Sequence, residues 1–312
     1  MDTLDEGTII LYRVKFFILL ILQTLSILIT LVVFTFFVTH RALLNTPQNQ
    51  SIIFLLIVNF LFATVDLPSL THFYSIGRVI PATAAYCTWW TFFEYTLNLI
   101  NELLMTTISI QRHMLIFYTQ VLQIRFKRIV FYYLPFLFCL IYPIVFYLSI
   151  IVLYPCDGTQ WDFTSKVCGY ANCYLIYSKV LSTYDLAVNN GLPVVIILLA
   201  NATLIIRVVR QKRRRQRVIT WKKQRRMTLQ LFSISTLYLI AWLPCLLIGL
   251  VQQLSSPSFL ADFQFNYALD LVYVIYLLLP WLCLGLLPEF RQWIWKKIHR
   301  WTTVRNNDVR PV

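Results

Sequence analysis

Seven apolar runs, each long enough to cross a membrane, recur along the chain and restrict its fold more than any other feature. They cover residues 16–38, 51–74, 87–117, 129–154, 185–209, 227–250 and 267–287. A helix of about 20 residues spans the hydrocarbon core of a bilayer. Transmembrane β-strands would instead alternate polar and apolar residues in segments of about ten. The sequence therefore predicts an all-α integral membrane protein built as a bundle of seven transmembrane helices.

The distribution of basic residues orients this bundle. Of the 27 lysines and arginines, five lie on one side, which leaves 22 on the other. The five are Arg13, Lys15, Arg78, Lys166 and Lys179. Cytoplasmic loops carry the excess of positive charge, so the N-terminus is expected outside. The net charge of +14 then reflects membrane orientation, and no nucleic-acid partner is expected.

The predicted organisation has four parts. They are an extracellular N-terminus over 1–15, a transmembrane domain over 16–288, an amphipathic helix over 289–301 and a cytoplasmic tail over 302–312. The acidic start and the long first apolar run argue against a cleavable signal peptide. The 289–301 segment has apolar residues on one side and basic residues around it, which is typical of a helix lying on the inner leaflet.

The third run carries a polar stripe. Glu94 and Arg112 are eighteen residues apart, five helical turns, and Asn98 and Asn101 lie between them on the same side. A carboxylate, two amides and a guanidinium cannot face lipid. This helix must therefore lie inside the bundle, around polar space.

Four cysteines are predicted outside the membrane, where disulfides persist. They are Cys87, Cys156, Cys168 and Cys173, and three pairings are possible. No histidine accompanies them, so we expect no zinc site, and we expect no other metal or cofactor.

At this point the chain resembles the rhodopsin-like (class A) G-protein-coupled receptors over nearly its whole length, most closely divergent orphan receptors of invertebrates. The resemblance rests on joint spacing in the expected helices. The matching positions are Cys87 with Arg112 25 residues later, Gln111-Arg112-His113, Ala241-Trp242-Leu243-Pro244, Pro193, Glu289-Phe290-Arg291, Asn59 and Pro68.

Several positions depart from the family pattern. Gln111 replaces the acid that holds the arginine in resting receptors, and the seventh run reads Leu279-Pro280-Trp281-Leu282-Cys283 instead of Asn-Pro-x-x-Tyr. The first-helix asparagine and the fourth-helix tryptophan are missing. The seventh run contains no lysine, which argues against a retinal Schiff base. These differences do not affect the fold assignment, but the family's detailed mechanism of switching between resting and active states cannot be transferred to this chain.

The resemblance implies a plasma-membrane receptor for an extracellular ligand that signals through a heterotrimeric G protein. A G-protein helix would dock beside Gln111, Arg112 and His113 when the sixth helix, kinked at Pro244, swings outward. The ligand site would involve Glu94, Asn98, Trp242, Tyr238, Asp270 and Tyr273. An N-terminus of about fifteen residues is too short for a hormone-binding domain. A small molecule or short peptide is therefore the expected ligand.

The family also implies a disulfide from Cys87 to the loop before the fifth helix. Spacing to Pro193 makes Cys173 the first choice of partner and Cys168 the second, and the remaining two cysteines could close a loop within the segment. Since Arg112 has no acidic neighbour, the resemblance also implies appreciable ligand-free signalling.

Glu94 allows three interpretations. It could bind a cationic ligand, it could hydrogen-bond internally as a neutral acid, or it could pair with a basic group of the protein. The third is disfavoured because no lysine or arginine lies within a span at that depth.

A transporter or channel is the alternative function. Transporters usually show internal repeats and broken helices, and channels show a repeated selectivity element; neither is present. An enzyme is not expected, because no paired acids or Ser/His spacing indicate catalysis.

Overall fold

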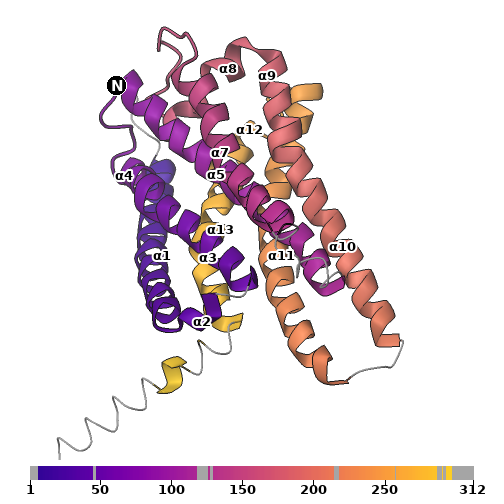
Figure 1. The fold of residues 1–312 in the computed structure, drawn as a ribbon. Helices are drawn as coiled ribbons and strands as arrows, with labels where there is room; N and C mark the ends of the chain where they lie inside the picture. Colours follow the sequence, from indigo (N-terminus) through magenta and orange to yellow (C-terminus); the bar gives the residue numbers. More distant parts are fainter. Residues whose placement is uncertain are drawn as a thin grey trace, which may run out of the picture.

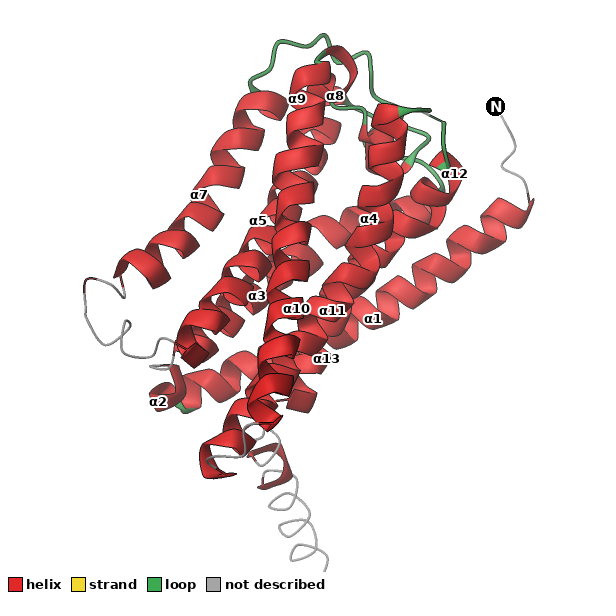
Figure 2. Cartoon of the chain, turned by 90° about the vertical axis from the view of Figure 1, so that its right-hand side faces the viewer, coloured by secondary structure: helices red, strands yellow, loops and turns green. Residues whose placement is uncertain are grey.

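The structure is a computed structural model that describes residues 6–44, 47–117, 126, 129–213, 218–256, 258–286, 290 and 293–296. In this part of the chain all regular structure is helical. Long helices run side by side as one bundle, and the loops that join their upper ends gather on the same side as the N-terminus (Figures 1 and 2).

Seven spans make up the bundle, several of them assembled from consecutive helical pieces. The first three are α1 (Glu6–Thr39), then α3 (Pro47–Leu61) with η1 (Phe62–Asp66) and α4 (Leu67–Ile76), then α5 (Ala84–Phe117). The fourth and fifth are η3 (Ile129–Tyr133) with α7 (Leu134–Tyr147) and η4 (Leu148–Val152), and α9 (Lys179–Tyr184) with η6 (Asp185–Gly191) and α10 (Leu192–Arg213). The last two are α11 (Val218–Leu254), and α12 (Ala261–Phe263) with η7 (Gln264–Ala268) and α13 (Leu269–Leu286).

The predicted seven-helix membrane bundle is confirmed, although some helices, such as α1, are longer than the apolar runs from which they were predicted. Six helical segments of the described chain are long and apolar enough to cross a membrane. The exception is α5, whose polar stripe lowers its hydropathy and which packs against α3, α7, α10 and α11. A helix surrounded by other helices does not face lipid, so it need not be apolar. The first helix begins at Glu6, ten residues before the apolar run, because helices continue beyond the hydrocarbon core.

Three spans contain a π-helical segment directly before a proline. These segments end at Asp66, Tyr133 and Gly191, two residues before Pro68, Pro135 and Pro193. Proline lacks an N–H and its ring clashes with the carbonyl one turn earlier, and a wider turn relieves both problems. Two buried acids lie on these segments: Asp66 ends the first and Asp185 begins the third.

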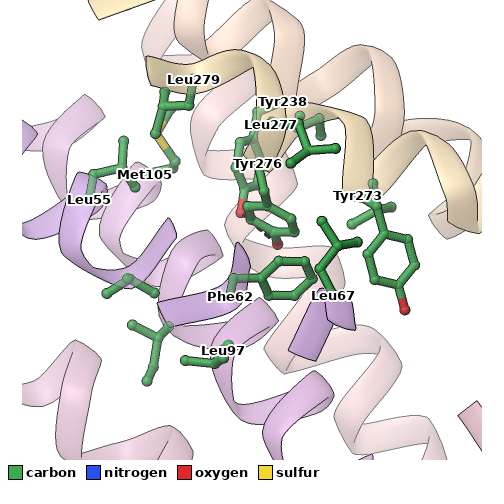
Figure 3. Packing of buried hydrophobic residues seen from close by; sticks show 14 of the residues in the cluster. Leu55, Phe62, Leu67, Leu97, Met105, Tyr238, Tyr273, Tyr276, Leu277 and Leu279 are labelled. Carbon is green, nitrogen blue, oxygen red and sulfur yellow. Dashed lines mark hydrogen bonds between the residues drawn. The ribbon is translucent and has the colours of Figure 1, made fainter. Parts of the chain in front are cut away.

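The centre of the bundle is aromatic. Phe62, fully buried, lies with its ring centroid 4.1 Å from that of Tyr276 and 5.5 Å from that of Tyr273. Figure 3 shows these rings beside Leu67, with Tyr238 close to Tyr276. These ring contacts pack the second span against the seventh, beside α5.

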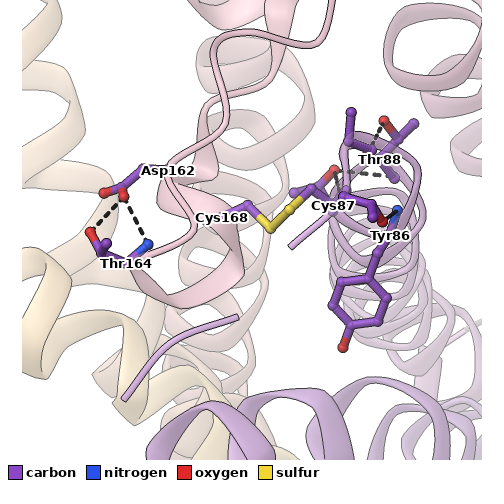
Figure 4. Close-up of a disulfide and its surroundings, with 9 residues drawn as sticks. Tyr86, Cys87, Thr88, Asp162, Thr164 and Cys168 are labelled. Atoms are coloured by element: carbon purple, nitrogen blue, oxygen red, sulfur yellow. Dashed lines mark hydrogen bonds between the residues drawn. A yellow bond between two sulfur atoms is a disulfide. The ribbon is translucent and has the colours of Figure 1, made fainter. Parts of the chain in front are cut away.

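Two disulfides fasten the outer loop between the fourth and fifth spans, which contains η5 (Lys166–Tyr170) and α8 (Cys173–Tyr177). Cys87 at the start of α5 is bonded to Cys168 (Figure 4). Cys156 is bonded to Cys173. The predicted first-choice pairing of Cys87 with Cys173 was therefore wrong. The sequence did not reveal the turn that precedes this bond: φ is positive at Val167, Cys168 and Gly169, and Cys168 is fully buried.

Below the bundle, the short α2 (Arg41–Leu44) joins the first and second spans. Residues 290 and 293–296 of the predicted amphipathic helix are helical, and Phe290 is fully buried with its ring centroid 5.1 Å from that of Phe36. The rest of 289–301 and the tail 302–312 lie outside the described residues.

Candidate functional site

A cavity of about 650 Å³ lies in the outer half of the bundle. Its walls come from α5, from the fifth, sixth and seventh spans, and from the outer loop. Three of the predicted ligand-site residues line it: Glu94, Asn98 and Trp242. Ligand pockets for small molecules commonly have volumes of about 300–1,000 Å³. The space is therefore suited to a small organic molecule or a few residues of a peptide.

Glu94 belongs to a buried polar chain in this wall. Its Oε1 accepts a hydrogen bond of 2.8 Å from Asn98 Nδ2, and Asn98 Oδ1 accepts one of 2.5 Å from the Tyr276 hydroxyl. Glu94 Oε2 has no partner within hydrogen-bond distance among the described residues, although the side chains of Asp66 and Tyr273 lie close enough to interact with the carboxyl group. Two acids from neighbouring spans thus meet here, a pairing that the linear sequence did not indicate.

Asp185 is a second acid in the cavity wall. Tyr147 Oη and Asn189 Nδ2 donate to its Oδ1 over 2.8 and 2.7 Å, and Tyr174 Oη donates to its Oδ2 over 2.8 Å. No motif in the sequence singles out Asp185. The available signal was its spacing of four residues from Asn189, which places an acid and an amide on one helical face.

Tyr238, Tyr273 and Asp270, also predicted to line the cavity, are not part of its wall. Tyr238 lies one turn below Trp242, and its hydroxyl oxygen is 3.5 Å from that of Tyr276 (Figure 3). Tyr273 is 1% exposed and interacts electrostatically with Glu94 and Tyr170. Their placement in the wall was wrong because both rings fill the aromatic core instead.

Asp270 is turned toward basic groups from two other segments. Lys166 Nζ of the outer loop lies 2.5 Å from its Oδ1, and Lys15 Nζ of α1 lies 2.8 Å from its Oδ2. The Tyr74 hydroxyl also donates to Oδ1 over 2.8 Å. We call Asp270, Lys15, Lys166 and Tyr74 the outer ionic cluster. It joins the first, second and seventh spans to the outer loop.

Lys166 is a basic group near Glu94 that does not belong to a span. Its side chain is only 7% exposed and interacts electrostatically with Glu94 as well as with Asp270. Burial lowers the pKa of the Lys166 ammonium below its ordinary value, and the Asp270 carboxylate opposes that shift. The prediction that no lysine or arginine within a span lies at this depth is not contradicted, but it did not consider a loop residue, and Lys166 approaches Glu94 from the outer loop.

At the inner end of α5, Arg112 is 4% exposed. Its Nε and Nη2 atoms have no hydrogen-bond partner in the described part of the chain. Gln111 Nε2 instead donates to the carbonyl oxygens of Phe131 and Tyr132, each over 3.3 Å. The side chain of His113, the third predicted coupling residue, lies outside the described residues.

These features together define a class: a seven-helix membrane protein with a polar cavity under a disulfide-bonded loop and a buried arginine at the opposite end of the third helix. Comparison with protein families gives the same answer. Residues 30–283 match the 7 transmembrane receptor (rhodopsin family). The chain belongs to this family of receptors.

Comparison with curated proteins gave no significant match. Family membership nevertheless establishes the general activity. The protein is a multi-pass receptor of a family typical of the plasma membrane, and it transmits an extracellular signal to a G protein. This family consists of receptors and not of enzymes. Membership of this family therefore rules out the alternative function as a transporter or channel.

Proposed function

We propose that this receptor responds to a small molecule or short peptide whose positively charged group binds at Glu94. The observation that carries the proposal is the unpartnered Oε2 atom of a carboxyl group that lines a cavity of about 650 Å³. A buried polar atom without a partner costs about 1–3 kcal/mol, and more when charged, so a ligand that supplies a donor removes this cost.

The charges around the cavity support a cationic ligand. Glu94 and Asp185 are both in the wall, which contains one basic residue, Lys179; Lys166 also interacts with Glu94 but forms its ion pair with Asp270. Asp185 already accepts three hydrogen bonds, so its lone pairs are largely engaged. Glu94 accepts one hydrogen bond at normal distance, from Asn98, and has the side chains of Asp66 and Tyr273 close by. A ligand ammonium therefore finds its free acceptor at Glu94.

The competing interpretation is that Glu94 stays neutral inside the bundle. Asp66 lies close enough for electrostatic interaction, and two neighbouring buried carboxyl groups disfavour double ionisation. In that case the proton on Glu94 would satisfy the polar network and the ligand would need no charge. The two interpretations differ in how ligand potency depends on ligand charge.

The proposed signalling step runs from this cavity to the inner face. Trp242 lines the cavity one turn below Cys245 and Leu246, on the helix that contains Pro244. A ligand that binds the active arrangement more tightly shifts the population toward it. Outward movement of the inner end of α11 would then expose Arg112, with Gln111 and His113, to the C-terminal helix of a G-protein α subunit.

Two finer expectations belong to the same proposal. The basic segment 207–226, which includes the end of α10 and the beginning of α11, would contribute to docking of the G protein or to anchoring at anionic lipid; its side chains lie outside the described residues. The likeness to divergent orphan receptors of invertebrates stays a sequence-based interpretation.

A ligand screen with a promiscuous G-protein readout identifies an agonist. Two variants, each of which replaces one carboxyl group by an amide, then test the site. Glu94→Gln should lower the potency of cationic agonists by about 100-fold or more, since loss of a charged hydrogen bond costs about 1.5–3 kcal/mol plus the Coulombic attraction. Glu102→Gln is the matched control. Glu102 is a buried carboxyl two turns further along α5 that does not line the cavity, and neither of its oxygens has a partner in the described chain.

Potency must be compared at equal surface expression. If Glu94→Gln leaves the potency of every agonist unchanged, Glu94 is not the ligand's counter-ion. If neutral and cationic agonists lose potency equally, the internal polar network is the better explanation.

A further inference from the structure

A second cavity, of about 570 Å³, lies at the opposite, inner end of the bundle. It lies between the end of α1, the short α2 and the helical residues 293–296. Its lining includes Phe36, His40, Arg41, Leu43, Trp293 and Lys296. It shares no residue with the outer cavity, and neither the family's general activity nor the ligand proposal uses it.

Aromatic packing holds the two sides of this inner cavity together. The Phe36 ring centroid lies 4.7 Å from that of His40 and 5.5 Å from that of Trp293. The rings of Phe290 and Trp293 are stacked with centroids 6.0 Å apart. Lys296 follows Trp293 by three residues, and Arg41 follows His40 directly. Arg41 and Lys296, which come from separate segments, therefore both line this one cavity.

No residue of the described chain forms an ion pair with either cation. Arg41 and Lys296 are exposed, and the ion pairs found in the described part of the chain are those of Asp270, at the other end of the bundle. By sequence, the inner side has 22 basic residues and two acidic ones, Glu289 and Asp308. This cavity consequently has positive charge available for an anionic ligand.

His40 adds a third potential donor. Its Nδ1 atom lies 3.1 Å from the Phe36 carbonyl oxygen and 3.0 Å from Thr39 Oγ1. Bonding to a carbonyl requires Nδ1 to be the protonated nitrogen, so Nε2 is the nitrogen left for an external partner. A doubly protonated imidazole donates from both nitrogens.

The apolar part of the lining indicates an amphiphile. Phe36, Leu43 and Trp293 share the cavity with the cations. On α1, the neighbouring residues Leu31, Val32 and Val38 are 46%, 42% and 62% exposed. A spanning helix presents such residues to acyl chains, and tryptophan is enriched where the membrane meets water. The family's orientation places this end at the cytoplasmic leaflet, which contains the anionic lipids.

We propose that this inner cavity binds the phosphate-bearing headgroup of an anionic phospholipid from the cytoplasmic leaflet. Arg41 and Lys296 hold the phosphate, His40 Nε2 donates to it, and the acyl chains lie along the exposed apolar face of α1. The lipid links α2 to the segment after the seventh span, so it fixes the amphipathic segment against the first helix.

The test uses the full-length receptor in detergent, titrated with dioctanoyl phosphatidylinositol 4-phosphate and, separately, with dioctanoyl phosphatidylcholine. The double variant Arg41→Gln/Lys296→Gln should bind the anionic lipid roughly 30-fold more weakly, because each basic residue near an anionic headgroup contributes about a factor of five. Phosphatidylcholine should bind weakly to both proteins. The charge-preserving variant Arg41→Lys/Lys296→Arg should retain most of the affinity.

The matched control is Arg125→Gln/Lys127→Gln, which removes the same charge from the inner side but does not alter the described lining of the cavity. It should leave the affinity within about twofold. The proposal is overturned if this control weakens binding as much as the cavity variant, because the attraction is then diffuse. It is also overturned if the cavity variant binds normally. Equally tight binding of the soluble headgroup, glycerophosphoinositol 4-phosphate, would assign the site to a free phosphate ligand and overturn the lipid assignment.

Discussion

Lys166 Nζ and Asp270 Oδ1 lie 2.5 Å apart, which joins the outer loop to the seventh span across 104 residues of sequence. Two residues after Lys166, Cys168 is bonded to Cys87 at the start of α5. The loop is therefore attached covalently to the third span and ionically to the seventh. Since Tyr170 of the same loop lines the outer cavity, these attachments determine the position of part of its wall.

Removing members of the outer ionic cluster should destabilise the receptor in a defined order. Asp270→Asn leaves the buried Lys166 and the half-buried Lys15 without their ion-pair partner, whereas Lys166→Met leaves Asp270 paired with Lys15. Breaking a buried ion pair costs about 3–5 kcal/mol, so we expect a lower unfolding temperature for both and the larger decrease for Asp270→Asn. Thermal unfolding of purified receptor measures this. Asp262→Asn, an exposed acid of α12, is the control and should have little effect. The reverse order would contradict the cluster's arrangement.

The two disulfides should contribute unequally. The Cys87–Cys168 bond closes a separation of 81 residues and the Cys156–Cys173 bond one of 17. In the chain-entropy description these correspond to about 4.5 and about 3 kcal/mol. Cys168→Ser should therefore lower surface expression and thermal stability more than Cys173→Ser. Peptide mapping without reduction checks the pairing directly. Recovery of a Cys87–Cys173 peptide would restore the pairing first expected from the sequence.

An acid at position 111 should reduce ligand-free signalling. Gln111 bonds to carbonyls of the fourth span, and Arg112 forms no ion pair with any described residue. Gln111→Glu supplies a carboxylate next to the guanidinium and should favour the resting state. Basal G-protein activation at matched surface expression measures the effect. Gln111→Ala removes the bonds to the fourth span without adding charge, and it should not lower basal activity. A Gln111→Glu receptor with unchanged basal activity would contradict this explanation.

Asp185 should tolerate an amide but not an apolar side chain. Asp185→Asn keeps an acceptor for Tyr147 and Asn189, and its new N–H₂ group can donate to the Tyr174 hydroxyl. Asp185→Ala leaves all three partners without an acceptor, and each unpartnered buried group costs about 1–3 kcal/mol. Surface expression and the unfolding temperature should fall sharply for the alanine variant alone. Similar losses in both variants would show that the negative charge itself is required.

The sequence by itself determined the membrane class, the number of spans and the orientation. These follow from the lengths of the apolar runs and from the unequal distribution of lysine and arginine between the two sides of the membrane. Both can be read segment by segment, without knowing which segments contact each other. It also placed Glu94, Asn98 and Trp242 correctly in one cavity, because helical periodicity fixes which residues of α5 share a face and because the sixth helix resembles the family's.

Only the tertiary structure decided which distant groups meet. Asp66 comes close to Glu94, Asp185 is held by tyrosines of two other segments, and Asp270 faces Lys15 and Lys166 instead of the cavity. Such pairings depend on helix rotation and on the path of a loop. The left-handed turn at Val167 and Cys168 also decided the disulfide partner. A buried charge must find a partner or a hydrogen bond somewhere, but its position in the chain does not specify which neighbouring helix will supply it.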